Sequence, residues 1–532
     1  MSSNGTLTVP GKRLPPELRG GWPLLGHALE FRHDPVRLLR RGRERFGDIF
    51  AFLLAGSKVA VLTGPKANEA FFRARDDQLS ARAAYQFTVP IFGKDIAYDT
   101  TPERMDEQLD LVTPALSEQR LRAYAAFIHE EAERYLDGWG EEGEVDLLKA
   151  TNELTVYIAS RCLVGREFRE NLSSEFARLY HDLEGGINLL AFFWQHLPLP
   201  SFQRRDRARV RMAELIAPII AGRRACAAED EDFLQTLMTA RYADGTGLSD
   251  DNITGLLLTL LFAGQHTSAV QAAWTGVELL RHPRYLAEVM REQEQMLGQV
   301  GELTFEALRD MLLLERGMRE AERLHPPLVM LMRKVIGDFG YQQYCLPPGW
   351  LALVSPAVTG RLPELYENPD RYDPGRFAPG REEDRKAKFA LVTFGGGKHA
   401  CIGTTFAYLQ VKAIWSVLLR RFDLELVDRH VQPNYATFVV GPRPPCRIRY
   451  RRRRRAVSVS LGDRAENAGH VGNVPVSLGT LKTSEKGTGL LNWCESIGTY
   501  NAGRSSVPFP DRVCDHVVRE SHESHGSASR FR

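Results

Sequence analysis

The stretch Phe394–Gly403 is the part of this chain best suited to chemistry, because it holds one sulfur in a backbone made largely of glycine. Three glycines precede Cys401 and one follows it. Glycine allows unusual backbone dihedral angles and a close approach to neighbouring groups. The composition is therefore suited to holding a thiolate against a large flat cofactor.

Apolar residues recur at helical spacing from Ile402 onward, which predicts a helix with Cys401 at its N-terminus. Unpaired backbone N–H groups and the helix dipole favour the anionic form of a sulfur there. A thiolate on haem iron promotes cleavage of the O–O bond. The alternatives are a buried inert thiol and a phosphate-binding loop, but Lys398 lacks the following Ser or Thr of such a loop.

The pattern Phe-x-x-Gly-x-His-x-Cys-x-Gly resembles the cysteine-ligand loop of the cytochrome P450 superfamily. The matching residues are Phe394, Gly397, His399, Cys401 and Gly403. The resemblance implies that Cys401 is the axial ligand of haem b iron. It also implies that His399 binds a haem propionate and that the other three residues shape the loop around the cofactor.

A long helix is predicted from Ser249, whose side chain can cap it, to His282-Pro283, where proline stops it. Asp250 and Asp251 place acidic charge in the first turn, where the helix dipole favours it. About 30 residues rising 1.5 Å each span roughly 45 Å. The segment is apolar nearly all round, so we expect it to be buried.

The middle of this helix contains Ala263–Ser268, with the letters AGQHTS. Small residues let a flat cofactor approach, and a threonine hydroxyl can loosen the helix locally. A satisfied His–Thr pair in the core is the alternative. The run resembles the oxygen-binding groove of the sterol 14α-demethylases, a cytochrome P450 family. The resemblance implies that Thr267 and His266 position or relay protons and that Ala263 faces the substrate.

An aromatic, irregular segment, Tyr85–Gly93, either packs as an ordinary loop or covers a ligand. It resembles the substrate roof of the sterol 14α-demethylases. The resemblance implies that Tyr85 contacts a haem propionate and the substrate, and that Phe87 covers the sterol. Asp95 and Met105 differ from the family pattern, which leaves open a related enzyme acting on another terpenoid or a polyketide.

Glu320-x-x-Arg323 resembles the helical ion pair of the superfamily, and Arg376 lies in the matching downstream loop. The three residues are expected to form a buried structural cluster beneath the haem. Arg333 matches a propionate-binding arginine, and a guanidinium can bind a carboxylate through two hydrogen bonds. The basic run 381–388, together with Lys398, could steer an acidic ferredoxin, although such runs are usually only solvated.

Composition limits the other function classes. The 69 basic and 67 acidic residues nearly balance, so bulk charge does not favour nucleic-acid binding. The seven cysteines are scattered and never spaced as Cys-x-x-Cys, which disfavours a disulfide framework or a zinc site and fits a reducing cytoplasm. Neither a signal peptide nor a transmembrane anchor is recognisable, so a soluble cytoplasmic protein is expected.

The fold implied by the resemblance is mostly α with a small β-rich lobe, with haem between the long central helix and the cysteine helix. The expected divisions are a flexible N-terminus over 1–11, a catalytic domain over 12–450 and a basic, disordered tail over 451–532. Helices are predicted over Pro35–Phe46, through most of 119–245 and over Thr304–Leu324, and a strand pair around Ala55-Gly56-Ser57. The aromatic patch within 187–194 fills the core or lines a cavity.

The implied function is that of a haem-thiolate monooxygenase that oxidatively removes the 14α-methyl group of a sterol. Three O₂-dependent oxidations release the carbon as formate, with electrons from NAD(P)H through a ferredoxin and its reductase or another external donor. The alternatives are hydroxylation of another terpenoid or polyketide, a haem-thiolate isomerase or dehydratase, and a non-enzymatic haem sensor. The tail has only Cys494 and Cys514, too few to hold a fused iron–sulfur cluster.

Overall fold

The structure, a computed structural model, describes residues 12–170, 174–187, 189–194, 196–225, 232–298 and 301–453. The expected flexible N-terminus over 1–11 and almost all of the expected tail lie outside these ranges. Strand β10 (Arg447–Arg452) runs two residues past the expected domain end at 450. Its arginines at 447, 449 and 451 lie close to acidic side chains of neighbouring strands and loops, as in an ordinary solvated ion-pair surface.

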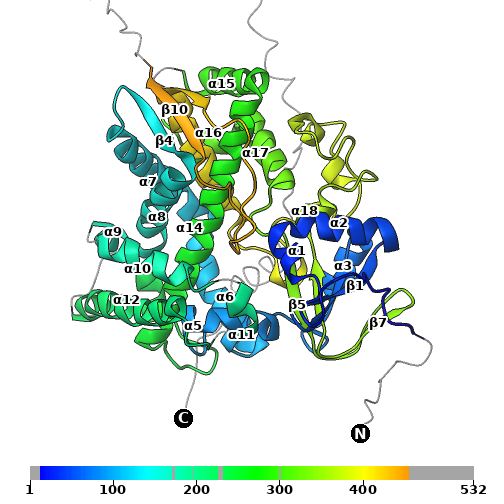
Figure 1. The fold of residues 1–532 in the computed structure, drawn as a ribbon. Helices are drawn as coiled ribbons and strands as arrows, with labels where there is room; N and C mark the ends of the chain where they lie inside the picture. Colours follow the sequence, from blue (N-terminus) through cyan, green and yellow to red (C-terminus); the bar gives the residue numbers. More distant parts are fainter. Residues whose placement is uncertain are drawn as a thin grey trace, which may run out of the picture. The chain divides into compact units, whose positions relative to one another are not determined.

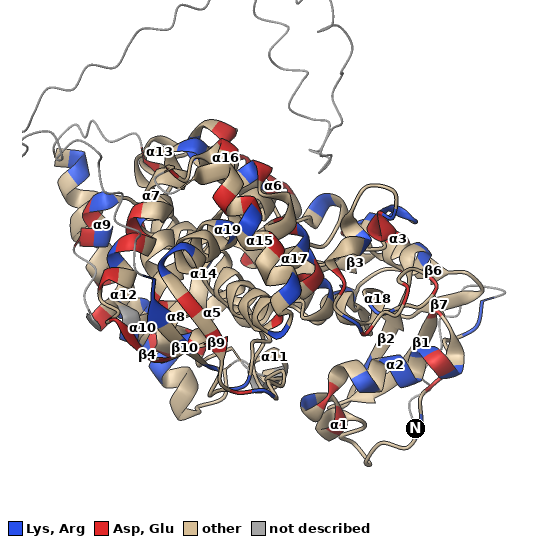
Figure 2. Ribbon diagram, turned by 90° about the horizontal axis from the view of Figure 1, so that it is seen from above, with Lys and Arg blue, Asp and Glu red and all other residues tan. Residues whose placement is uncertain are grey.

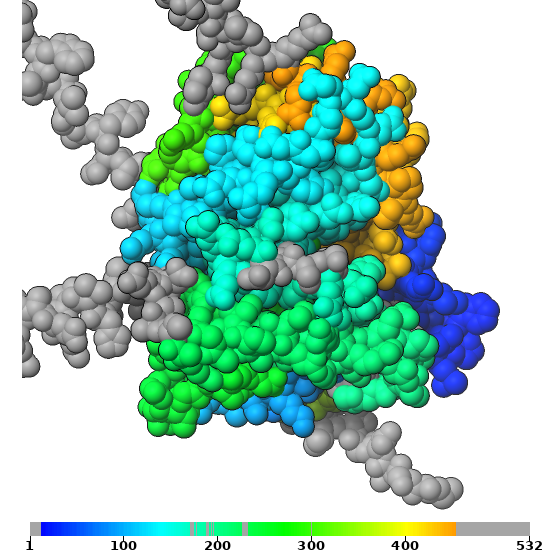
Figure 3. Space-filling model, turned by 90° about the vertical axis from the view of Figure 1, so that its left-hand side faces the viewer, coloured from blue at the N-terminus to red at the C-terminus, as the bar shows by residue number. Residues whose placement is uncertain are grey.

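Helices make up most of the described chain. The α-helices are α1 (Ala28–His33), α2 (Pro35–Phe46), α3 (Pro65–Arg73), α4 (Ala81–Ala84), α5 (Val89–Phe92), α6 (Pro102–Val112), α7 (Glu118–Asp137), α8 (Leu147–Ala159), α9 (Arg166–Glu170), α10 (Ser174–Glu184), α11 (Leu189–Trp194), α12 (Pro200–Ala225), α13 (Phe233–Thr239), α14 (Asp250–Arg281), α15 (Pro283–Leu297), α16 (Phe305–Asp310), α17 (Leu312–Leu324), α18 (Pro356–Thr359) and α19 (Thr404–Arg421). A π-helical turn, Ser160–Val164, extends α8. In Figure 3 the helical side of the molecule is covered mainly by cyan to green residues, which belong to the first half of the chain.

The strands form three small sheets. The first has five strands in the order β1 (Ile49–Leu54), β2 (Ser57–Leu62), β8 (Leu351–Val354), β5 (Leu331–Val335) and β3 (Leu79–Ser80). The second pairs β10 with β4 (Glu142–Asp146) and β9 (Phe422–Leu426), and the third pairs β6 (Phe339–Tyr341) with β7 (Tyr344–Leu346). Figure 1 shows the five-stranded sheet beside α1 and α2, apart from the helices around α14. The expected fold class, mostly α with a small β lobe, is confirmed.

Helix capping and turn geometry explain why the predicted start of α2 and the predicted strand pair β1–β2 are confirmed. The Asp34 side chain accepts a hydrogen bond from the N–H of Arg37, so α2 begins at Pro35 as predicted. Strands β1 and β2 pair antiparallel from Ile49 opposite Leu62 to Leu54 opposite Ser57. Ala55 and Gly56 between them both have positive φ, 47° and 81°, as a two-residue hairpin turn requires.

The long helix α14 runs through the helical part of the molecule (Figure 1). The Ser249 hydroxyl accepts a hydrogen bond from the N–H of Asn252, 3.1 Å away, which satisfies one free donor of the first turn. The helix ends at Arg281, and Pro283 starts α15. Both predicted ends are therefore confirmed, because capping and proline act locally.

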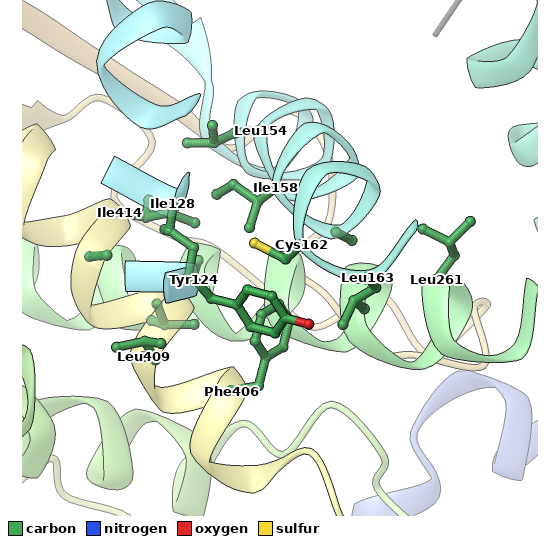
Figure 4. Close-up of a cluster of buried hydrophobic side chains, with 14 of the residues drawn as sticks. Tyr124, Ile128, Leu154, Ile158, Cys162, Leu163, Leu261, Phe406, Leu409 and Ile414 are labelled. Carbon is green, nitrogen blue, oxygen red and sulfur yellow. The ribbon is translucent and has the colours of Figure 1, made fainter. Parts of the chain in front are cut away.

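The core around α14 is tightly packed. Side chains of α7, α8, its π-helical turn, α14 and α19 meet in one apolar cluster (Figure 4). The indole N–H of Trp415 in α19 donates to the Ala272 carbonyl of α14 at 2.8 Å. A Cβ at Gly276 would lie only 2.0 Å from a ring carbon of Trp415, so α19 can approach α14 only because this position is glycine.

Two sequence expectations need correction. The helix predicted over Thr304–Leu324 is two helices, α16 and α17, separated at Met311. The Glu292 carboxylate of α15 accepts the N–H groups of Leu313 and Leu314 and so caps a new helix start from a distant segment. The stretch 119–245, expected to be helical, also contains the strand β4, which exists because β10 pairs with it.

Within the described residues, two helical segments are long and apolar enough to cross a membrane by length and composition, α14 and the stretch from Gly397 to Arg421. Most of the apolar window of each, 61% and 67%, is buried inside the fold. These segments are therefore core helices, as expected for α14.

We predict that Gly276→Ala lowers the free energy of unfolding by about 1–3 kcal/mol, because the added methyl group forces α14 and α19 apart. The matched control is Gly222→Ala in α12, where a Cβ meets nothing within 4 Å. That control should be neutral or stabilising by up to about 1 kcal/mol, because alanine favours helix. Chemical denaturation followed by circular dichroism measures the free energy of unfolding of both variants. An equal loss of stability in the two variants would contradict the packing argument.

Candidate active site

The Cys401 loop is fixed by its backbone. The N–H of Cys401 donates to the Phe394 carbonyl at 2.9 Å, closing the loop over the glycines. Gly395 and Gly397 have φ of 73° and 64°, which side chains rarely allow. A Cβ on Gly397 would also lie 2.2 Å from the carbonyl oxygen of Phe72. Both the positive φ and the lack of space therefore require glycine at this position.

The Cys401 thiol differs from the other described cysteines. Cys162, Cys345 and Cys446 are buried, whereas Cys401 is exposed. Helix α19 begins at Thr404 with Gly403 as its cap, so Cys401 lies just ahead of the helix N-terminus. Surrounding protein raises the pKa of the Cys401 thiol, while hydrogen bonds from the Gly403 backbone and the Thr404 side chain oppose that rise. Among the described cysteines, this thiol alone is both accessible and hydrogen-bonded as a thiolate ligand needs.

A buried ionic cluster lies between α17 and the loop that carries Arg376. Arg323 binds both Glu320 carboxylate oxygens at 2.8 Å, and the Nε of Arg376 binds one of them, also at 2.8 Å. Arg376 also binds Glu383 at 2.7 Å. Glu320, Arg323 and Arg376 are fully buried. The three residues singled out from the sequence therefore meet, and Glu383 is a fourth member without a recognisable sequence signal.

Arg333 of β5 is a buried cation with an unusual environment. Its side chain stands over the Phe71 ring at 5.3 Å, and within the described residues it forms no ion pair. Burial lowers the pKa of its guanidinium, and the nearby Tyr85 and Tyr98 hydroxyls partly offset this. A buried arginine without a carboxylate partner is suited to an anionic group of a ligand.

Two tyrosines lie beside Arg333. The Tyr85 hydroxyl accepts a hydrogen bond from the N–H of Met332 at 3.2 Å, which leaves its own proton free to donate. Tyr98 stacks on Tyr85 with ring centroids 4.9 Å apart. Burial and the neighbouring Tyr85 raise the pKa of Tyr98, whereas the charge of Arg333 opposes that rise. The sequence interpretation assigned a role to Tyr85 and missed Tyr98, whose only signal was its place shortly after the same aromatic segment.

His399 lies against an acid that the sequence did not reveal. Its Nε2 is 3.0 Å from an Asp76 carboxylate oxygen, and Lys398 binds Asp76 at 2.8 Å and Asp106 at 3.1 Å. Burial and the Arg333 charge lower the pKa of His399, which favours a neutral imidazole. In the neutral ring the single N–H faces the Asp76 carboxylate, so the propionate contact stays a prediction that requires His399 to be protonated or to turn away from Asp76.

The middle of α14 opens on one side. Ala263 is exposed and Thr267 is half-buried, although most of the helix is buried. The Thr267 hydroxyl donates to the Ala263 carbonyl at 2.6 Å, a bond that competes with the helix ladder. A Cβ on Gly264 would lie 3.6 Å from the Phe406 ring of α19, so this part of α14 faces the helix that follows Cys401.

His266 points to a second helix. Its Nδ1 is 2.6 Å from a carboxylate oxygen of Glu184, the last residue of α10. Both side chains are about one-fifth exposed, but the two facing atoms are buried. Glu184 has no recognisable sequence signal, because its role comes only from the packing of α10 near α14.

Phe87 lies in a buried aromatic cluster. It is buried, with the rings of Phe192 and Phe438 each 5.5 Å away and Tyr85 at 5.9 Å. Of the patch 187–194, Ala191 and Phe192 therefore pack into this cluster, Trp194 is exposed, and residue 188 lies outside the described chain. Asp95 has φ of 60°, so it adopts the backbone conformation that a glycine would.

These side chains fit a haem. Several suitable groups lie in one region. The Cys401 thiol suits the iron, and the buried Arg333 and the free proton of Tyr85 suit the propionates. The α14 face at Ala263 and Gly264 carries only small side chains, so a flat cofactor can approach it. Among the described residues, no group of three or more His, Cys, Asp and Glu side chains is arranged to hold a metal ion. The thiol, the arginine and the tyrosine suit a haem-thiolate site that oxidises an apolar molecule.

We predict that Cys401→Ser abolishes the thiolate-type absorption band of the reduced carbon monoxide complex, because serine is a poor iron ligand. The fold should persist, since the described contacts of Cys401 with the loop are mainly through its backbone. Circular dichroism checks the fold. The matched control, Cys345→Ser at a buried cysteine of β7, should keep the band. Retention of the band in Cys401→Ser would exclude this ligand.

Known proteins are similar to this chain in sequence over most of their length. The cytochrome P450 family profile matches residues 15–448. The sterol 14-demethylase of Arabidopsis thaliana is 40% identical over 449 residues, covering 83% of this chain and 92% of the relative. The sterol 14alpha-demethylase of Mycobacterium tuberculosis is 41% identical over 444 residues, covering 82% and 98%.

A solved structure, the retinoic acid-bound cyanobacterial CYP120A1, superposes with a TM-score of 0.75 at 27% identity, covering 83% of this chain and all of that one. The fold, the thiolate loop and these similarities agree. The chain belongs to the cytochrome P450 family and, within it, to the sterol 14-demethylases.

Proposed function

We propose that this protein is a haem-thiolate monooxygenase that removes the 14α-methyl group of a sterol as formate in three O₂-dependent oxidations. The observation that carries the proposal is an exposed Cys401 just ahead of α19, together with the turn of α14 at Gly264 that faces Phe406 of the same helix. About 40% identity to sterol 14-demethylases along most of the chain supports the substrate class.

Cys401, Arg333 and Tyr85 would hold the cofactor. Haem, when bound, supplies the oxidising chemistry, and the protein orients the substrate and the protons. Arg333 offers a two-pronged donor for one propionate, and Tyr85 offers its free O–H. The Gly403 N–H and the Thr404 side chain stabilise negative charge on the sulfur. Phe394 and Gly397 shape the loop, and Gly403 both shapes it and supplies this N–H.

Thr267 and His266 would supply protons. The Thr267 hydroxyl donates to Ala263, which leaves its lone pairs free to accept a hydrogen bond. The partly exposed His266–Glu184 pair offers a route for a proton from solvent to the α14 face. Phe87 and Tyr85 would exclude water above the substrate, so a proton enters along this polar route.

Electrons come from an external redox partner, and we propose a ferredoxin with an NAD(P)H-dependent reductase in the cytoplasm. The basic run expected to steer it is partly neutralised, since Arg381, Arg385 and Lys398 all form ion pairs. Within the described chain, Lys386 and Lys388 form none. These two lysines are the better candidates for contact with an acidic donor.

Titration of the ferric protein with a 14α-methyl sterol, lanosterol or eburicol, should shift the Soret band from low to high spin, because an apolar substrate excludes water from the iron. A sterol without the 14α-methyl group serves as the comparison in a turnover assay for formate and should release none. Haem-loaded protein that shows no shift with either methylated sterol would move the substrate to another terpenoid or a polyketide.

Thr267→Ala should lower formate release by about 10²–10⁴-fold, the usual contribution of a positioned proton-transfer group. The sterol-induced Soret shift should remain, because Thr267 does not form the apolar roof. Thr259→Ala is the matched control, since its hydroxyl makes the same bond to a carbonyl four residues earlier, at 2.8 Å to Gly255. Equal losses in both variants would mean that helix distortion, and not proton handling, is responsible.

A further inference from the structure

Helix α17 carries a second buried acid, two residues after Glu320. The side chain of Glu322 is buried, and within the described residues it forms no ion pair. Glu320, by contrast, is bound by both Arg323 and Arg376. A buried carboxylate without a cation is costly for stability, and such groups gather at functional sites.

Two hydroxyl groups bind the Glu322 carboxylate, one from each side of the Cys401 loop. The Thr393 hydroxyl donates to one carboxylate oxygen, and the Tyr408 hydroxyl donates to the other at 2.8 Å. Thr393 immediately precedes Phe394, where the loop begins, and Tyr408 lies on α19, which follows the loop. Figure 2 shows α17 and α19, the two helices that the Tyr408 hydrogen bond joins. Glu322 therefore bridges the two ends of the loop.

The bridge reaches the sulfur through Phe394. The Phe394 ring packs on the Tyr408 ring with the centroids 5.6 Å apart, and the Phe394 carbonyl accepts the N–H of Cys401 at 2.9 Å. Burial raises the pKa of the Cys401 thiol, and the negative charge of Glu322 raises it further. Glu322 thus acts on the sulfur both through the backbone of the loop and through its charge.

The other charges around Glu322 are already balanced. On the same helix, Arg319 pairs with Asp384 at 2.7 Å, and Glu315 pairs with Lys412 of α19 at 2.8 Å. When Glu322 is ionised, its charge is therefore the one in this group that no ion-pair partner offsets within the described chain.

The protonation of Glu322 depends on opposing effects. Burial raises its pKa, whereas the hydrogen bonds from Thr393 and Tyr408 and the charge of Arg319 oppose that rise. Burial and the Glu322 charge raise the pKa of Tyr408 well above its usual value, so this phenol remains a neutral donor. Glu322 is therefore neutral in acid and gains its charge as the pH rises.

We propose that Glu322 is a positioning residue for the haem thiolate. Its carboxylate holds both ends of the Cys401 loop and places negative charge near the sulfur, which strengthens electron donation to the iron and lowers the reduction potential of the haem. This inference rests on the haem-thiolate part of the proposed function and is independent of the sterol.

The test is a potentiometric titration of the haem-loaded protein at a series of pH values. In the unmodified protein the reduction potential should fall as Glu322 ionises. Glu322→Gln keeps the shape of the side chain and can still accept a hydrogen bond from a hydroxyl. It should have a more positive potential above the pKa of Glu322 and lack this part of the pH dependence. Other titrating groups such as His399 are shared by both proteins.

The matched control is Glu294→Gln on α15, which removes one exposed negative charge. This variant should keep the reduction potential and the pH profile of the unmodified protein. An equal shift in the control would mean that net charge, and not the position of Glu322, sets the potential.

Tyr408→Phe tests the hydrogen bond while leaving the carboxylate in place. The lost hydrogen bond stabilises the charged form, so the pKa of Glu322 should rise and the fall in potential should move to higher pH. This second variant decides the question if Glu322→Gln fails to bind haem.

The reduced carbon monoxide complex separates the effect of charge from that of a structural clamp alone. In Glu322→Gln the thiolate-type band should persist to lower pH than in the unmodified protein, because loss of the negative charge lowers the pKa of Cys401. A residue that only clamps the loop would give the opposite result, with the band lost at higher pH.

The proposal would be overturned by unchanged pH profiles of the potential in Glu322→Gln and Tyr408→Phe, by an equal shift in Glu294→Gln, or by earlier loss of the band in Glu322→Gln. Absence of the thiolate-type band from the unmodified protein would instead contradict the haem-thiolate function itself, so the two failures are distinguishable.

Discussion

The buried ion cluster of Glu320, Arg323, Arg376 and Glu383 is the interaction on which the position of the thiolate loop depends. Two acids balance two bases, and none of the four is accessible beyond a few percent. Removing one partner would leave a buried charge uncompensated, at a cost of about 3–5 kcal/mol. The cluster therefore fixes the chain between α17 and Cys401 in a single arrangement.

The opposite wall of the site depends on small residues and not on charge. Gly276 lets α19 contact α14, and Gly264 brings the open turn of α14 against Phe406. Because Cys401 immediately precedes α19, the distance between the sulfur and the open turn is set by this helix pair. The ion cluster on one side of the loop and the contact between α14 and α19 on the other thus together determine where Cys401 lies.

The site contains groups whose partners come from distant segments. Asp106 pairs with Lys398 beside the loop, and Asp76 joins both Lys398 and His399. Asp95, which differs from the family pattern, takes a left-handed backbone conformation. The loop is therefore held by acids whose partners lie far away in the chain.

The sequence alone determined the features that depend on neighbouring residues. The ends of α2 and α14, the hairpin around Ala55-Gly56 and the nature of the Cys401 loop follow from capping, proline, turn dihedral angles and motif. Tertiary structure alone decided the break at Met311, the strand β4, the pairing of His266 with Glu184 and the bridge that Glu322 forms across the Cys401 loop. In each of these cases the deciding group or surface belongs to a segment far away in the chain, and such contacts leave no periodic pattern in the sequence.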